Sequence, residues 1–200
     1  VWDMCVITLY LIINILDLVW LTKGDERKVE VLSRIALPTA ILVHSVTAWI
    51  FGLEIAKEGW YSAIMAPIFV ASALDSGLAL LLIALAALRK TGIFDCGANL
   101  MKSLAGLLAT CIAIDFFLVM CEILTVAYPG TEAGKALLSI MIGGSTAPFF
   151  WAEIVVGLVI PFCILVLEKN RSNQALVVTA SVLVVLGVFC KRVWLLFSRH

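Results

Sequence analysis

The chain has 200 residues, of which 63% are hydrophobic and only 14% are charged, whereas soluble domains are about half apolar and about a quarter charged. Lys and Arg together number 14, as do Asp and Glu, so there is no basic excess of the kind that nucleic-acid binding needs. This composition excludes an ordinary soluble domain and predicts a protein whose solvent is lipid.

The predicted elements are apolar runs of about the 20 residues that a helix needs to cross a bilayer. Unpaired backbone groups cannot face lipid, so runs of this length are predicted to be helical. In chain order, the predicted membrane-spanning helices are residues 4–22, 33–54, 62–88, 100–127, 146–168 and 174–197. The partly apolar stretch 132–144 is predicted to lie at the membrane interface. The fold class is therefore an all-α integral membrane bundle of about six helices, forming a single domain over residues 1–200.

The connections between the helices indicate their orientation. Most Lys and Arg residues lie in or beside the connections near residues 23–34, 89–102 and 169–171. Positive charge favours the cytoplasmic side, so these three connections are predicted to be cytoplasmic in a multi-pass protein of the cell's inner (cytoplasmic) membrane. The sequence begins inside an apolar run without Met, from which we expect it to be part of a longer protein.

Two ionisable residues occupy the centres of adjacent predicted helices. His44 lies in the middle of the second and Asp75 in the middle of the third. A charge at the bilayer centre costs about 2.5–3.5 kcal/mol on insertion scales, so such residues indicate function by default. A lone buried His is more often a satisfied core residue, but a carboxylate at matching depth favours a His–Asp pair that takes up or releases a proton.

The fourth and fifth predicted helices also carry acids. Asp115 and Glu122 are seven residues apart on one helical face, about 10 Å along the axis, which suits a water-bridged proton path. Glu153 is predicted to extend this path. Gly157 and Pro161 follow Glu153 at steps of four and predict a kinked helix with a face of small residues.

The last helix carries a basic pair, Lys191 and Arg192, near its predicted outer end. Arg192 among the acids could neutralise them and hold a carbonyl oxygen, while the alternative for this pair is snorkelling to the interface. With the predicted orientation, Glu122, Glu153 and Arg192 lie in the outer half of the membrane. The polar groups predict one cavity, suited to a ligand with an apolar body and polar carbonyl or hydroxyl ends, such as a quinone.

Other cofactors and chemistries find less support. A b-type haem with two axial histidines needs both at usable depth, and the sequence offers only His44 and the terminal His200. The chain has 6 cysteines without a Cys-x-x-Cys pair, so we expect neither an iron–sulfur cluster nor another metal site. No Ser-His-acid or Cys-His grouping predicts nucleophilic catalysis.

Three runs carry a resemblance to a known family: LVHSVTAWIFG at residues 42–52, GWYS at 59–62 and PIFVASALDSGLA at 67–79. They resemble the NrfD/PsrC family of polysulfide-reductase membrane subunits, which includes DsrP-like subunits of sulfur metabolism. Residues 151–162 and 191–193 are similar to that family more weakly. The resemblance implies a larger subunit of about eight to ten helices, without its own redox metal, that binds quinone or quinol, usually menaquinone in anaerobic respiration.

The resemblance also implies partners and site residues. The partner would be an iron–sulfur (ferredoxin-like) subunit, with further redox subunits such as a multihaem cytochrome or a molybdopterin protein. The family's site histidine and acid match His44 and Asp75, and its later acid and basic residue match Glu153 and Arg192. We add Trp60, an aromatic interface anchor, to the predicted quinone-binding residues.

The leading hypothesis is therefore a quinone-binding membrane subunit of a multi-subunit respiratory oxidoreductase. The buried acids leave open a second hypothesis, an ion- or solute-translocating transporter subunit, although no inverted repeat supports it. A third is a structural membrane anchor, in which the acids matter only for assembly.

Overall fold

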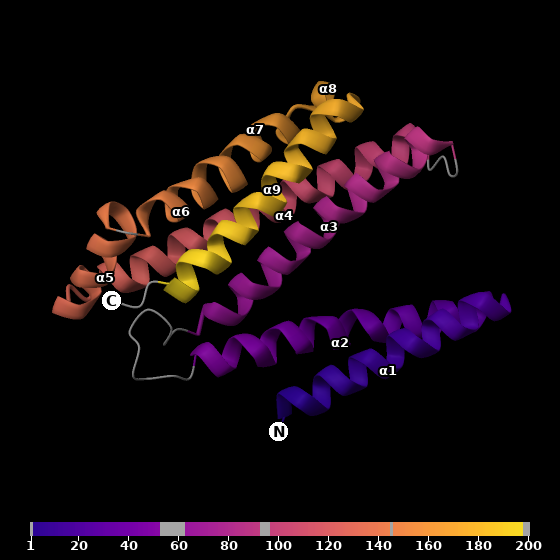
Figure 1. Ribbon diagram of the computed structural model, residues 1–200, viewed down its shortest axis with the longest axis horizontal. Helices are drawn as coiled ribbons and strands as arrows, with labels where there is room; N and C mark the ends of the chain where they lie inside the picture. The colour runs from indigo at the N-terminus through magenta and orange to yellow at the C-terminus, as the bar shows by residue number, and fades with distance from the viewer. Residues whose placement is uncertain (1, 53–62, 93–96, 145, 198–200) are drawn as a thin grey trace. The chain divides into compact units, whose positions relative to one another are not determined.

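The computed structural model describes residues 2–52, 63–92, 97–144 and 146–197, and the regular structure of these residues is entirely helical. The elements are α1 (Trp2–Lys23), α2 (Glu26–Gly52), α3 (Met65–Thr91), α4 (Ala98–Ala127), α5 (Glu132–Gly143), α6 (Ala147–Trp151), the π-helix η1 (Ala152–Val159), α7 (Ile160–Val166), α8 (Glu168–Arg171) and α9 (Gln174–Phe197) (Figure 1). Within the described ranges, 6 stretches are long and apolar enough to cross a membrane: α1, α2, α3, α4, the run from α6 to α7, and α9. The predicted all-α, multi-pass membrane protein is confirmed.

Most helix ends agree with the predicted spans to within a few residues, but α2 begins at Glu26, well before the predicted residue 33. Asp25 caps this early start, because its Oδ1 accepts a hydrogen bond from the Lys28 backbone N–H at 3.4 Å. The predicted interfacial stretch forms α5, which Thr131 caps by accepting a hydrogen bond from the Gly134 N–H at 3.1 Å. The first turn of α2 is charged, so it lies outside the apolar run from which the start of this helix was predicted.

The chain divides into two compact units, residues 1–70 and 71–200, which are described separately. Their union into the single domain that the sequence predicts stays a prediction.

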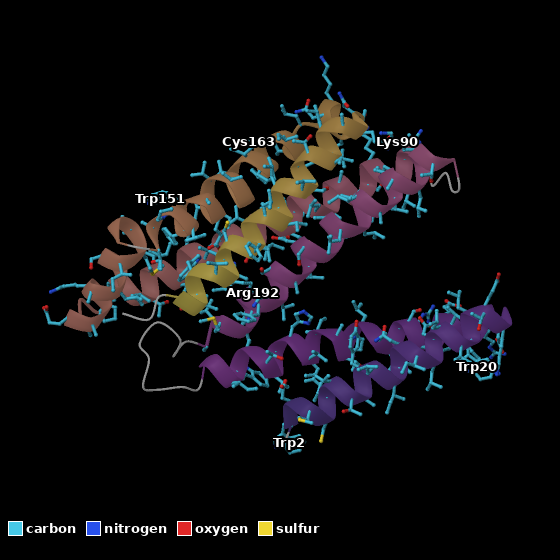
Figure 2. All side chains as sticks on the ribbon, in the orientation of Figure 1. Trp2, Trp20, Lys90, Trp151, Cys163 and Arg192 are labelled. Atoms are coloured by element: carbon cyan, nitrogen blue, oxygen red, sulfur yellow. The ribbon has the colours of Figure 1, made fainter. Side chains whose placement is uncertain are left out.

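In the first unit, α1 and α2 pack together as a hairpin whose turn contains Gly24 at φ +74°. Across the hairpin, Thr47 Oγ1 donates to Asp3 Oδ1 at 3.1 Å. Figure 2 shows Trp2 and Trp20 at opposite ends of α1, as expected of aromatic anchors at the two faces of a membrane.

The second unit has a dry core shared by α3, α4, α7 and α9. Leu82, Leu108, Leu165 and Val184 are among its fully buried members. At the end of α7, Arg171 donates from Nε to the Leu165 carbonyl at 2.5 Å, which satisfies a carbonyl that the helix end leaves without an intrahelical partner. This core fixes the helices that carry the buried charges described below.

The fifth membrane-spanning stretch contains a π-helix where the sequence predicts a kink. Pro161 has no N–H, and its ring would clash with the Gly157 carbonyl four residues earlier in an α-helix. The backbone widens instead, and the Ile160 N–H donates to the carbonyl of Val155, five residues back. The π-helix lies against α9, where a Cβ on Gly157 would come within 2.5 Å of the Gly187 Cα. Only glycine permits so close an approach of the two backbones.

Candidate functional site

Three charged side chains from three helices meet inside the second unit. Lys191 Nζ on α9 lies 3.1 Å and 3.2 Å from the two carboxylate oxygens of Asp115 on α4, and 3.3 Å from Glu153 Oε1 on η1. Asp115, Glu153 and Lys191 are exposed by only 1%, 2% and 6%. We call these three residues the ion cluster. Buried charges are tolerated when they are paired, so both acids depend on the one lysine that lies between them.

Trp194 completes the surroundings of Glu153. Its indole N–H donates to Glu153 Oε2, while Lys191 lies beside the other carboxylate oxygen. The Trp194 ring also packs edge-on against Phe150, with centroids 5.7 Å apart. Both oxygens of Glu153 are thereby fixed in place by α9.

The contact between Gly157 and Gly187 sets the register of this pairing. Glu153 precedes Gly157 by one helical turn, and Lys191 follows Gly187 by one turn on the facing helix. Because η1 and α9 run in opposite directions, the close glycine contact brings Glu153 and Lys191 to the same level. The π-helix, typical of functional sites, therefore positions an acid against a buried lysine.

The structure brings together two of the acids predicted to form the proton path, Asp115 and Glu153, through Lys191, the member of the basic pair that was not predicted to neutralise them. Lys191 forms ion pairs with both acids. Arg192 is half-buried and within electrostatic range of the same two acids. Glu122 is half-buried on α4. Lys191 follows Ala180, Val184 and Gly187 at helical spacing, whereas Arg192 is rotated off that face, and the burial of the face is visible only in the packed helices.

Asp75 is a second polar feature of this unit. Its side chain is fully buried on α3, and neither of its carboxylate oxygens has a hydrogen-bond partner among the described residues. The same holds for the hydroxyl of Ser72, one turn earlier on the same face. Asp75 lies within electrostatic range of Asp115 and Lys191. Buried polar groups almost always have partners, so this pair points to a molecule or segment that supplies them.

His44 belongs to the first unit, on α2. Its Nδ1 lies 3.0 Å from the Ala40 carbonyl oxygen, and a carbonyl can only accept, so Nδ1 carries the proton in the neutral ring. Nε2 is then the nitrogen able to accept a hydrogen bond. Asp75 belongs to the second unit, so the His44–Asp75 pair stays a prediction. Trp60 and His200 lie outside the described residues.

Comparison with known proteins gives consistent results. Residues 2–199 match the family described as polysulphide reductase, NrfD. The chain is 30% identical, over 100% of its length and 51% of the relative's, to a Halobacterium salinarum protein provisionally named as a dimethyl sulfoxide reductase membrane subunit. It is 33% identical to a selenate reductase subunit of Mesobacillus selenatarsenatis, over 87% of this chain and 40% of the relative. It is 25% identical to the Hdr-like menaquinol oxidoreductase integral membrane subunit of Archaeoglobus fulgidus, over 98% of this chain and 50% of the relative.

The chain thus spans about half the length of the curated relatives it matches. The family match, in contrast, covers nearly all of this chain, including the runs around His44 and Asp75 and the segments that form the ion cluster. The chain belongs to the NrfD (polysulphide reductase) family.

Proposed function

We propose that this chain forms part of the quinone-binding membrane subunit of a respiratory oxidoreductase complex, which exchanges electrons between a menaquinone or other quinone pool and an iron–sulfur partner subunit. The observation that carries the proposal is Asp75, fully buried in a membrane-spanning helix with both carboxylate oxygens unpartnered among the described residues, beside an unpartnered Ser72 hydroxyl. A quinol combines an apolar body, suited to this depth, with hydroxyl groups that can donate to these oxygens.

In this proposal Asp75 orients the substrate and handles its proton. Oxidation of a quinol releases two electrons and two protons, so a base must lie within hydrogen-bond reach of its hydroxyl. The Asp75 carboxylate accepts that hydrogen bond and then the proton. His44, through its Nε2, is the second proposed acceptor, with Trp60 and Arg192 among the proposed binding residues.

The ion cluster provides the proposed onward route for protons. Asp115 and Glu153 share the Lys191 ammonium, and the field of that ammonium reaches Asp75. Protonation of Asp75 therefore changes its electrostatic interaction with the ion cluster. Glu122, further along α4, is the proposed continuation of the path.

Family membership and the names of the relatives support the membrane-subunit part of the proposal. One relative is named as a menaquinol oxidoreductase integral membrane subunit, and the other two are named as reductase subunits. The proposal extends to a ferredoxin-like iron–sulfur partner, to further redox partners such as a multihaem cytochrome or molybdopterin protein, and to the cytoplasmic membrane as the location.

The test replaces Asp75 with Asn and, separately, His44 with Ala in the full-length protein, and measures quinol oxidation by the assembled complex. Loss of a general base costs about 10²-fold or more, so each variant should fall by at least that factor. Asp25→Asn, a carboxylate exposed in the α1–α2 turn, is the matched control and should keep the normal rate. Normal turnover in both site variants would contradict the site.

The transporter alternative makes a different prediction. Substrate-driven flux into liposomes that hold this protein without its redox partners would favour it. In that case the ion cluster, rather than Asp75, would be the first set of residues to replace.

A further inference from the structure

A large groove lies in the second unit, between the last turns of α3 and the first turns of α9. Its volume is about 1030 Å³, and two of its lining residues are joined by a hydrogen bond from Gln174 Nε2 to the Ala86 carbonyl at 3.2 Å. Figure 2 shows Lys90 beside this end of the unit and Arg192 toward the opposite end of α9. The groove is therefore separate from the ion cluster.

The lining of the groove changes character along its length. Away from the helix ends the wall is mainly apolar, with Ile83, Ala87 and Val178 among its residues. Thr179 also lines it, and its hydroxyl donates to the carbonyl of Ala175, in the first turn of α9. From Ile83 to Lys90 the groove follows about 10 Å of α3, at 1.5 Å per residue. A molecule that fills it must present an apolar part to the membrane interior.

The end of the groove at the helix termini is polar and basic. Arg89, Lys90 and Ser172 line it. Both basic residues lie in the last turn of α3, at the edge of a membrane-spanning segment. This end belongs to the connections that the positive-inside rule assigns to the cytoplasm.

We propose that this groove binds one anionic phospholipid of the cytoplasmic leaflet. An acyl chain lies along the alanine-lined wall, and the phosphate lies between Arg89, Lys90 and the Ser172 hydroxyl. Basic pockets between membrane helices on the cytoplasmic side are suited to acidic headgroups, and each basic residue near the membrane surface adds attraction. A transmembrane segment of a protein would match the apolar wall but would bring no phosphate to the basic end.

The site is independent of the proposed quinone site. Asp75 lies two helical turns before Ile83 on α3, about 12 Å along the axis. Lipid binding here can therefore be tested without reference to quinol oxidation.

The experiment uses the full-length protein in its complex, stripped of lipid in mild detergent, with native mass spectrometry as the readout. Phosphatidylglycerol and phosphatidylcholine are titrated separately, and inorganic phosphate is added as a competitor. We expect phosphatidylglycerol to bind at least tenfold more tightly than phosphatidylcholine, with inorganic phosphate a weak competitor. Arg89→Gln and Lys90→Gln should each weaken phosphatidylglycerol binding about fivefold.

Two further variants keep the test decisive. Lys135→Gln removes an exposed lysine of α5 that pairs with Glu132, and it should leave binding unchanged. Ala87→Phe fills the apolar wall while keeping both basic residues, so it should weaken binding of both lipids. Three results would each overturn the proposal: equal binding of the two lipids, displacement by phosphate at comparable concentration, or groove variants without effect because another segment of the protein fills the groove.

Discussion

The α1–α2 hairpin and the second unit bury very different shares of their apolar spans. In α1 and α2 only 11% of the most apolar window is buried, against 33% to 39% in the spans of the second unit. The polar side chains differ accordingly. In the hairpin, Thr8 and Asn14 donate to carbonyls of their own helix at 2.7 Å. In the second unit, Asp115, Glu153 and Lys191 bond across three helices.

This difference shows what an ion pair inside a membrane requires. Two helices taken by themselves enclose no interior, so a charge on either of them stays close to the surface of the pair. Several packed helices create an interior that excludes lipid and in which an acid and a base can neutralise each other. In the hairpin, polar side chains bond within their own helix or in single cross-helix pairs such as Thr47–Asp3, whereas in the second unit three charged side chains contact one another.

The largest expected effect comes from removing the shared cation of the ion cluster. Lys191→Met leaves two buried carboxylates without their partner, which should lower the free energy of unfolding by about 3–5 kcal/mol. The measurement is unfolding of the protein in detergent micelles. Lys135→Met, which breaks the exposed Lys135–Glu132 pair, is the control and should cost about 1 kcal/mol or less. Equal losses in the two variants would mean that the cluster does not stabilise the second unit.

The glycine contact should give the next largest effect. Gly157→Ala or Gly187→Ala places a methyl group against the facing backbone, where it cannot fit without moving a helix. Overpacking of this kind costs about 1–3 kcal/mol. Gly77→Ala on α3 is the control, because its Cβ would meet nothing within 4 Å, and it should stabilise by about 0.5–1 kcal/mol. If the η1–α9 contact is this close, thermal unfolding should show a lowered Tm for Gly157→Ala and Gly187→Ala and a raised Tm for Gly77→Ala.

The cross-helix bond of the hairpin should contribute less. Thr47→Val removes the hydroxyl that donates to Asp3, and side-chain hydrogen bonds between membrane helices average about 0.6 kcal/mol. Thr8→Val removes a hydroxyl that bonds only within α1, so it should cost less still. If Thr47→Val lowered the free energy of unfolding by several kcal/mol, polar contacts in the hairpin would stabilise as much as those of the ion cluster, which would contradict the contrast between the two units.

The smallest effect concerns Asp25, in the exposed turn of the hairpin. A hydrogen bond from the Lys28 side chain holds the pKa of the Asp25 carboxyl below its ordinary value of 3.8. A carboxyl with a lowered pKa in the folded state stabilises the fold above its ordinary pKa, and that contribution disappears as the pH falls through the lowered value. Asp25→Asn should therefore unfold slightly earlier than the unaltered protein at pH 7, and equally near about pH 2. A difference that grows toward acid pH would contradict this assignment.

The sequence alone was sufficient for the membrane-spanning helices, because their length and hydropathy follow directly from the thickness of the bilayer. It was not sufficient for the π-helix. Pro161 indicated a disruption, but a disrupted helix can either kink or widen. The close contact of Gly157 with Gly187, which lies far along the chain, forms only when the helices pack. Local sequence patterns carry no record of that contact.

The acids of the candidate site were predictable and their cation was not. Asp115 and Glu153 stand out because an isolated acid in an apolar run has few explanations. Lys191 and Arg192 are neighbours in sequence, and one position on a helix rotates a side chain by about 100°. Which of the two forms the ion pairs is decided by the face that α9 turns toward α4 and η1, a property of the packed bundle.

The ion cluster also has a consequence for the making of the protein. Asp115 enters the membrane during synthesis long before Lys191, which lies 76 residues further along the chain. At about 5–20 residues per second, the carboxyl waits roughly 4–15 seconds for its partner. During that interval α4 carries an unpaired acid in a membrane that disfavours it. The arrival of α9 is thus the step of biogenesis that supplies the Asp115 carboxyl with its cationic partner.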